Sequence, residues 1–425
     1  MRKLGLHWQI LIALLLAALL GKLGSADSAL FGVRLIAVAS FVGELFLRAL
    51  RMLVVPLIMA SIISAVAGLG ETHSLGRLGL KTAAYYLLTS LLAVLIGLAV
   101  VDLLTPGLIN GVPAKEQIGL SGDVATVAKQ VEGRSGKDVV EVFLRLVPKN
   151  VVADAAKGEM LGLIFFSLLF GFFATRIDDE QRRVVRAFWD GVYNIMLRIT
   201  DWVIGFAPIG VFALVLKVVL TTGFDAFRPL LTFVVCVLLG LGIHSLLVLP
   251  LLLKFVGKVS PLAHYRAMAP ALLMAFSTAS SSATLPLTMD CVQDRAGVST
   301  RVSSFTLPLG ATVNMDGTAL YECVAAIFIA QAYGIQLTIA QQFTVVVIAL
   351  LTSIGVAGIP AASLVAITLI LTAIGLPLEA IGLILAVDRV LDMCRTTVNV
   401  FSDSCGAVLI AKSEGETVLT GAVET

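Results

Sequence analysis

An apolar segment near the end of the chain, residues 381–410, carries charged and amide side chains at helical spacing. Asp388, Asp392, Arg395, Asn399 and Asp403 follow one another at steps of four, three, four and four residues. This spacing places them on one face of a helix. A charged residue at the centre of a membrane helix costs about 2.5 to 3.5 kcal/mol. We therefore expect this polar face to lie inside a helix bundle.

The residue types on this face suit a ligand that carries both charges. The planar guanidinium of Arg395 can hold a carboxylate in a bidentate manner. Asp392 can hold an ammonium group, and Thr396 lies beside both on the same face. The face therefore predicts a site for an amino acid with an acidic side chain. The structural alternative is an ion-pair network among Asp388, Asp392 and Arg395, and part of the face is expected to be that.

A second group of polar residues interrupts an apolar run at residues 310–320. Asn314 and Asp316 stand there between glycines, a composition that breaks a helix. An unwound turn frees backbone carbonyls, and carbonyl, carboxylate and amide oxygens are the ligands that a sodium ion needs. Asn399 and Asp403 could complete such a site. The alternative is a hydrogen-bonded kink that binds no ion.

Three further features lie in apolar surroundings. Tyr86, Thr89 and Ser90 form a polar cluster that usually signals hydrogen bonding between helices. Glu322 is an acid without a basic neighbour in sequence. Burial disfavours an ionised carboxylate, so Glu322 could carry a proton or be permanently neutral and hydrogen-bonded. A lone histidine, His244, is expected to be a hydrogen-bonded packing residue.

The composition identifies the elements that must position these residues. Of 425 residues, 58% are hydrophobic and only 14% are charged, and the mean hydropathy is +1.00. A typical soluble protein has about 25% charged residues, so we expect a membrane protein. A net charge of +2 gives no field for nucleic acid. The five cysteines have no disulfide or zinc-site spacing.

Six apolar runs are long enough to cross a bilayer, which takes about 20 residues. The first is expected to be a retained helix rather than a cleaved signal peptide. Basic residues in the short connections place one side in the cytoplasm, with the long connection 105–148 outside. We therefore expect a multi-pass protein of the cell, or inner, membrane. The runs are residues 7–23, 37–69, 80–104, 152–174, 192–220 and 230–255.

The last 170 or so residues differ, because two small, polar, proline-containing stretches cut their apolar runs. These stretches, residues 277–286 and 353–363, each lie between arms too short to span a membrane. Such a pattern predicts a helical hairpin that enters the bilayer and turns back. Irregular backbone at this depth must be buried in protein or line a polar cavity, and paired interruptions often mark a transporter's binding site. The alternative is two kinked helices without a ligand.

Taken together, these motifs resemble the dicarboxylate/amino acid:cation symporter family, which includes the excitatory amino acid transporters. The resemblance covers nearly the whole chain. Its most specific parts are the serine-rich stretch at 277–286 and the Asn-Met-Asp-Gly-Thr segment at 314–318. It implies an all-α polytopic membrane protein with eight transmembrane helices and two re-entrant helical hairpins. It also implies a homotrimer that works by an elevator mechanism.

The resemblance divides the chain into a static scaffold and a mobile transport domain. Scaffold helices 1 and 2 are expected at 1–75, and the extracellular loop with helices 4 and 5 at 105–225. Helix 3 of the transport domain is expected at 76–104. The rest of that domain, helix 6, hairpin 1, helix 7, hairpin 2 and helix 8, is expected at 226–415. A cytoplasmic tail follows at 416–425.

The resemblance also assigns sites residue by residue, with Glu322 as a candidate proton carrier. Its substrate contacts correspond to Ser280, Ser281, Ser282, Thr318, Ile359, Ser363, Asp392, Arg395, Thr396 and Asn399. Its sodium contacts form three groups: Gly310, Asn314, Asn399 and Asp403; Thr312, Ser353, Ile354 and Val356; Tyr86, Thr89, Ser90, Asn314 and Asp316.

We therefore expect a secondary active symporter of L-glutamate or L-aspartate, driven by sodium and with Glu322 as a route for protons. Sodium is the coupling ion, no other cofactor is expected, and the chain is not expected to be an enzyme. Its partners would be the substrate, these ions, membrane lipid and further copies of itself. The nearest alternative is a proton-driven symporter of C4-dicarboxylates or glutamate, independent of sodium. An ion channel, which would pass current without moving a substrate, and a hydrolase are both disfavoured. A hydrolase could use the serines at 280–282 as nucleophiles, but no base lies near them in sequence.

Overall fold

Long apolar runs joined by short connections give a chain that is helical almost throughout its described part. The computed structural model describes residues 6–23, 29–30, 33–68, 76–115, 144, 147–157, 160–222, 227–355, 362–378 and 381–419. Within these ranges the strands are two short antiparallel pairs, β1 (Ala29–Leu30) with β2 (Val33–Arg34) and β3 (Leu108–Ile109) with β4 (Val112–Pro113). The predicted all-α class is confirmed.

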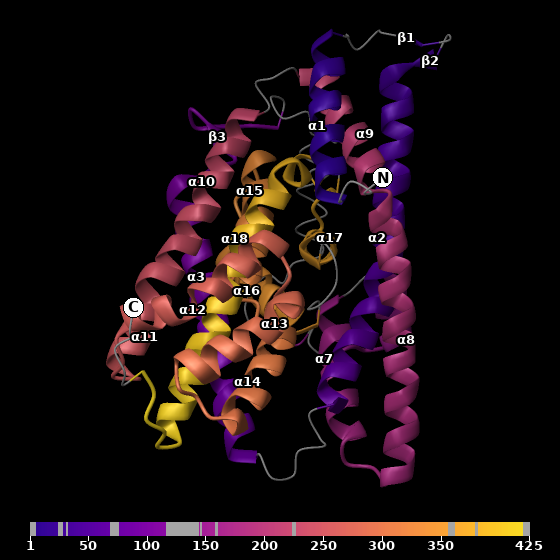
Figure 1. The fold of residues 1–425 in the computed structure, drawn as a ribbon. Helices are drawn as coiled ribbons and strands as arrows, with labels where there is room; N and C mark the ends of the chain where they lie inside the picture. Colours follow the sequence, from indigo (N-terminus) through magenta and orange to yellow (C-terminus); the bar gives the residue numbers. More distant parts are fainter. Residues whose placement is uncertain are drawn as a thin grey trace, which may run out of the picture.

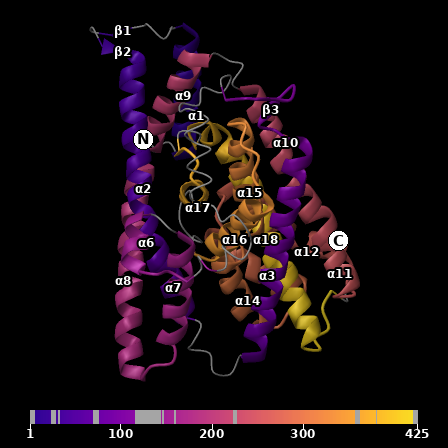
Figure 2. The ribbon, with the colours of Figure 1, turned by 180° about the vertical axis from the view of Figure 1, so that it is seen from behind.

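Most of the described helices in the first half of the chain form one side of the molecule. It comprises α1 (Leu6–Leu23), α2 (Leu35–Gly68), α6 (Val151–Lys157), α7 (Met160–Ala174), α8 (Asp179–Gly205) and α9 (Ala207–Thr222). Here α1 packs on α9, and α2 packs on α7, α8 and α9. In Figure 1 these helices stand together on the right, and in Figure 2 they stand on the left.

The other side is built around two central helices, α15 (Asp316–Ala332) and α18 (Ile381–Ser413). Two elements from elsewhere in the sequence cover them: α3 (Gly76–Leu104) and α10 (Phe227–Ile243), which continues through the π-helical turn η3 (His244–Val248) into α11 (Leu249–Phe255). Both α15 and α18 pack against α3 and α10. The remaining helices are α12 (Pro261–Thr278), α13 (Ser281–Asp290), the π-helical turn η4 (Cys291–Arg295), α14 (Thr300–Val313), α16 (Ile339–Gly355) and α17 (Ala362–Ile374).

The first predicted interruption is present as a turn between α12 and α13. Ala279 has a left-handed backbone conformation with φ of 49°, and the side chain of Ser280 accepts the Ala283 N–H at 3.2 Å to cap α13. The second interruption follows α16, and residues 356–361 within it lie outside the described part. The predicted break near Asn314 is also present, because α14 ends at Val313 and α15 begins at Asp316.

The prediction of one helix over 192–220 was wrong at its start and in its continuity. Helix α8 begins at Asp179, 13 residues earlier, because its first turns are amphipathic rather than apolar. It then meets α9 at a bend of 50°. The prediction identified the apolar half of α8 and joined it to the next helix.

Several described helices have the dimensions of membrane spans. Three are both long and apolar enough: Arg77–Leu104, Pro229–Phe255 and Thr300–Ala332. A fourth span results if the bent pair Asp179–Val203 and Ala207–Lys217 is taken as one. Shorter apolar helices, such as Gly162–Ala174 and Ile339–Thr352, accompany them. These helices are consistent with the predicted multi-pass membrane protein.

Candidate functional site

The polar face of α18 lies inside the molecule, as its spacing predicts. Arg395 has no exposed surface. Its Nη2 lies 3.0 Å from Asp388 Oδ1, 3.0 Å from Asp392 Oδ1 and 3.2 Å from Ser363 Oγ of α17, so its two hydrogens are shared among three acceptors. Its Nε and Nη1 are buried and have no hydrogen-bond partner among the described residues. Two donor nitrogens of this buried guanidinium are therefore unpaired among the described residues.

Tyr321 of α15 fixes the position of this guanidinium. Its ring centroid lies 3.8 Å from the Arg395 Cζ atom, which is a close cation–π contact. Its hydroxyl donates to Asp388 Oδ1 at 2.9 Å. The predicted ion-pair network is therefore present, with Asp388 as its central acceptor. Tyr321 was not predicted, since nothing in its local sequence links it to α18.

The break between α14 and α15 meets α18 at Asn399. The Asn399 Oδ1 accepts the Gly317 N–H at 2.8 Å, and its Nδ2 donates to Thr318 Oγ1 at 3.1 Å. A Cβ at Gly317 would lie 2.8 Å from the Arg395 carbonyl oxygen, so only glycine fits this approach. Thr318, Asn399 and the buried Thr396 thus lie close to Arg395.

A second cluster of oxygen atoms lies further along α18. Asn314 Nδ2 donates to Asp403 Oδ1 at 2.9 Å and to Ser402 Oγ at 3.1 Å. A Cβ at Gly310 would lie 2.5 Å from Asp403 Oδ1 and 2.6 Å from the Tyr86 hydroxyl oxygen. Three members of the first predicted sodium group, together with Tyr86 of the third, therefore converge in space.

Asp316 is hydrogen-bonded to residues of three helical elements. Its Oδ1 accepts from Ser90 Oγ of α3 at 2.7 Å, and its Oδ2 accepts from Ser402 Oγ of α18 at 2.6 Å. His244 Nε2 lies 2.9 Å from the same Oδ2. His244 is the first residue of η3, and a π-helical turn is frequent at functional sites. The sequence predicted a hydrogen-bonded histidine but not this partner.

This cluster contains the types of oxygen atom that small hard cations prefer as ligands. Carboxylate, amide, hydroxyl and backbone oxygens are suited to such ions rather than to zinc or copper. Thr89, also predicted here, has its hydroxyl bonded to the carbonyl oxygens of Tyr85 and Tyr86 at 3.1 and 3.3 Å. It lies on the same buried segment of α3 as Ser90 and Tyr86.

Glu322 lies one turn beyond Thr318 on α15 and has no exposed surface. Its Oε2 is 2.8 Å from Thr352 Oγ1 of α16. Its Oε1 is buried without a hydrogen-bond partner among the described residues. This geometry keeps both of the predicted roles open, a proton carrier and a permanently neutral acid.

The remaining predicted residues are less fully defined. Ser280 is the N-cap of α13, and Ser281 and Ser282 form its first turn. Val356 and Ile359 lie outside the described residues. So do the side chains of Thr312, Ser353 and Ile354, whose backbones belong to α14 and α16.

Comparisons with known proteins find relatives that cover nearly the whole chain. The chain is 34% identical over 416 residues to a proton/sodium-glutamate symport protein of Bacillus caldotenax, covering 98% of this chain and 96% of the relative. It is 34% identical over 412 residues to a proton/glutamate-aspartate symporter of Escherichia coli, covering 97% of this chain and 93% of that relative. It is also 34% identical over 449 residues to excitatory amino acid transporter 3 of mouse, covering 96% of this chain and 85% of that relative.

The family model "Sodium:dicarboxylate symporter family" matches residues 6–413. This match includes every element that contributes to the two polar clusters, and its members are transporters rather than enzymes. The chain belongs to the sodium:dicarboxylate symporter family.

Proposed function

We propose that this protein is a secondary active symporter that carries L-glutamate or L-aspartate together with sodium. One observation carries the proposal: Arg395 is fully buried, held by Tyr321 and Asp388, and keeps two guanidinium nitrogens without a described partner. A buried unpaired donor on a charged group is costly. A substrate carboxylate that accepts from these nitrogens would remove that cost.

The neighbours of Arg395 suit the rest of an acidic amino acid. Asp392 is partly exposed and close enough to Arg395 to face the same ligand, so it would hold the ammonium group. Asn399 and the turn at Ser280–Ser282 would hold the main-chain carboxylate. Thr318 and Thr396 complete this side, and Ser363 links Arg395 to α17. The names of the Bacillus caldotenax and Escherichia coli relatives support glutamate as a substrate.

Sodium would be a co-transported ion. The cluster at Asp403, Asn314 and Gly310 supplies one set of oxygen ligands, and the cluster at Asp316, Ser90 and Tyr86 supplies another. A third set would use Thr312 with the backbone of α16 and the residues that follow it. The two described clusters are adjacent. Asn314 Oδ1 lies 3.4 Å from Ser90 Oγ, and Asn314 Nδ2 lies 2.9 Å from Asp403 Oδ1. Ions bound in them would stabilise the break that also positions Thr318.

Glu322 is our candidate for a co-transported proton. A carboxyl group with one neutral hydroxyl partner and an unpaired second oxygen favours its neutral form. The relatives named as proton symporters support this role.

A proton-driven symporter of C4-dicarboxylates remains the second candidate, because one contact favours it. Asp392 already pairs with Arg395 at 3.0 Å and with Arg389 at 3.5 Å. Two arginines can satisfy its charge, so it does not require a substrate ammonium group. A substrate with two carboxylates and no amine, such as succinate, would then suffice.

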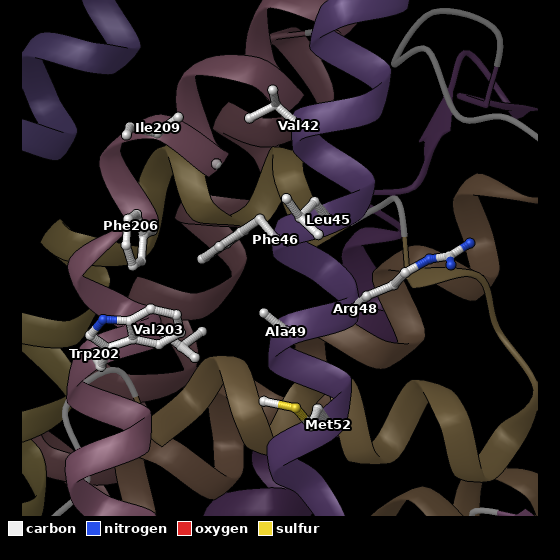
Figure 3. Close-up of a pocket in the computed structure, with 11 residues that line it drawn as sticks. Val42, Leu45, Phe46, Arg48, Ala49, Met52, Trp202, Val203, Phe206 and Ile209 are labelled. Atoms are coloured by element: carbon white, nitrogen blue, oxygen red, sulfur yellow. The ribbon is translucent and has the colours of Figure 1, made fainter.

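We extend the proposal to the assembly and its movement. Eight spans and two hairpins, in a cell-membrane protein, would form a scaffold (α1, α2, α7, α8, α9) and a transport domain that slides as an elevator. An apolar groove of about 490 Å³ between α2 and the α8–α9 junction supports a homotrimer (Figure 3). Its lining is apolar except for Arg48 and includes Leu45, Met52, Trp202 and Phe206. A second copy, or lipid, would cover this surface.

The proposed function is tested by uptake of radiolabelled L-glutamate and L-aspartate into liposomes that hold the purified protein. Sodium, proton and potassium gradients are imposed one at a time, with succinate as a competitor. We expect uptake that requires external sodium and that succinate inhibits weakly. Uptake that is driven by a proton gradient without sodium, and that succinate blocks completely, would establish the second candidate instead.

A further inference from the structure

The hydroxyl group of Thr352 has one hydrogen atom but more than one acceptor within hydrogen-bond distance. Thr352 Oγ1 lies 2.8 Å from Glu322 Oε2, but also 2.9 Å from the Ile348 carbonyl oxygen and 3.0 Å from that of Ala349. A hydroxyl group has one hydrogen to donate. It therefore cannot donate to the carboxylate and to a backbone carbonyl of α16 at the same time.

The protonation state of Glu322 determines to which acceptor the Thr352 hydroxyl group donates. When Glu322 carries a proton, its O–H can donate to Thr352 Oγ1, and the hydroxyl hydrogen then turns to the backbone of α16. When Glu322 is ionised, it can only accept, so the hydroxyl must turn toward it and leave the carbonyl oxygens. Both side chains are buried, so water is not an easy substitute partner.

Thr352 lies where a change in its hydrogen bonding would affect the end of α16. Thr352 lies in the last turn of α16, directly before Ser353 and Ile354, whose carbonyls the family resemblance assigns to a sodium site. A threonine hydroxyl that donates to the carbonyls three and four residues earlier often bends a helix. The direction of the Thr352 hydroxyl therefore bears on the end of α16, where the second interruption begins.

We propose that Thr352 is the positioning residue that links the proton on Glu322 to the end of α16. This inference rests on the proposed role of Glu322 as a proton carrier. In the protonated state the Thr352 hydroxyl donates to α16, and in the ionised state it donates to Glu322. Loading and release of the proton thereby change the hydrogen bonding of the helix that leads into the second hairpin.

The other elements packed against α15 contribute few ionisable groups to this contact. From α18, the positive charge of Arg395 acts on Glu322. Asp102 of α3 and Cys236 of α10 act on the adjacent Cys323. The sequences of α16 and α17 contain no ionisable side chain. Thr352 is therefore the direct partner through which Glu322 meets α16.

Thr344 provides a matched control on the same helix. Its hydroxyl donates to the Ala340 carbonyl oxygen at 2.8 Å, and its side chain is buried like that of Thr352. It lies two turns earlier on α16, where no described hydrogen bond joins it to a carboxylate. A general effect of removing a buried hydroxyl from α16 would appear in both Thr344→Val and Thr352→Val.

The test is the pH dependence of L-glutamate affinity, measured by calorimetry on the purified full chain in saturating sodium. A hydrogen bond to an ionised carboxylate is stronger than one between neutral groups, so removing the hydroxyl destabilises ionised Glu322 more. We expect Thr352→Val to move the alkaline midpoint of binding upward by about one pH unit. Thr352→Ser, which keeps the hydroxyl, and Thr344→Val should retain the wild-type midpoint.

The variant Glu322→Gln separates this inference from the proposed role of Glu322 as a proton carrier. If Glu322→Gln leaves the pH dependence intact, Glu322 is not the proton carrier and both proposals fail. If Glu322→Gln removes the pH dependence but Thr352→Val binds with the wild-type midpoint, only the role of Thr352 is overturned. An equal shift in Thr344→Val would overturn it too. Thr352→Ala serves in place of Thr352→Val if the latter does not fold.

Discussion

The two sides of this molecule differ in the charged side chains that they bury. The α15–α18 side encloses Arg395, Asp316 and Asp403, all nearly without exposed surface and all hydrogen-bonded across helices. The α2–α8–α9 side has an apolar interior and also exposes large apolar residues, such as Trp202 at 66%. Polar groups in an apolar medium must find partners inside the protein, whereas apolar groups can face lipid or another copy. Large apolar residues are exposed on both sides, but the buried carboxylates and the buried arginine among the described residues all lie on α15 and α18.

The largest expected effect comes from removing the central charge of the polar side. Arg395→Cys leaves Asp388 and Asp392 without their shared partner and the substrate without its carboxylate donor. Breaking a buried charge pair costs about 3 to 5 kcal/mol. We therefore expect the affinity for L-glutamate to fall by about two to three orders of magnitude. Neutral amino acids should be accepted better, as measured by competition for uptake. Unchanged uptake of acidic substrates would refute the role of Arg395.

The next effect concerns sodium at the break between α14 and α15. Asp316→Asn keeps the size of the side chain but removes the charge that Ser90, Ser402 and His244 surround. We expect the sodium concentration for half-maximal L-glutamate binding to rise by about 10-fold. Asp290→Asn, on α13, is the control and should leave the sodium dependence unchanged. Equal sodium dependence in wild type and Asp316→Asn would remove Asp316 from the ion site.

Removing the proton route should alter pH dependence without abolishing transport. Glu322→Gln keeps a polar group beside Thr352 but cannot ionise. Because wild-type uptake should weaken as the pH rises and the proton is lost, the variant should show nearly constant uptake between about pH 6 and 9. Liposome uptake at fixed sodium measures this, and a wild-type pH profile in the variant would contradict it.

On the apolar side, Trp202→Ala should weaken the assembly while leaving the site intact. A buried aromatic side chain at an interface is often worth about 2 kcal/mol or more. We expect a larger monomer fraction in native mass spectrometry, with L-glutamate affinity within about twofold of wild type. Phe255→Ala, an exposed residue on α11, is the control. A trimer fraction equal to wild type would show that the groove in Figure 3 is not the interface.

The smallest effect is expected at the end of α18, outside both regions. Glu414 receives hydrogen bonds from Lys81 at 2.6 Å and Arg77 at 2.8 Å, and these lower its pKa from 4.5 to about 2. The contribution of Glu414 to the free energy of unfolding is fully present above the pKa that this group has in the unfolded chain. It is lost as the pH falls through the folded-state pKa of about 2. Glu414→Gln should therefore lower the unfolding temperature slightly between pH 6 and 8, by about 1 °C or less, and leave the pH profile of transport unchanged. A shifted transport profile would contradict this separation.

The sequence predicted the polar side well because its signals are local. The face of α18 follows from helical spacing, and the break at Asn314 follows from glycines and polar residues within a few positions. Both are visible without knowledge of the tertiary structure. The assignment of each residue to substrate or ion came from the family resemblance and stays a prediction.

The features that the sequence missed depend on contacts across the fold. Tyr321 and His244 each lie in an apolar helix, and only the packing of α15 against α18 and α10 brings them to Asp388 and Asp316. The start of α8 was missed because the amphipathic turns from Asp179 do not form an apolar run. Hydropathy identifies apolar runs that are long enough to span a bilayer. It does not detect the polar first turns of a helix or a bend between two helices.

We expect the substrate site and the ion clusters to form one coupled unit on the polar side. Calorimetric titration of the purified protein with L-glutamate, in a series of sodium concentrations, measures this coupling. The affinity for L-glutamate should rise steeply with sodium, and binding should be lost when choline replaces sodium. An L-glutamate affinity that is the same with and without sodium would show that the two sites are not coupled.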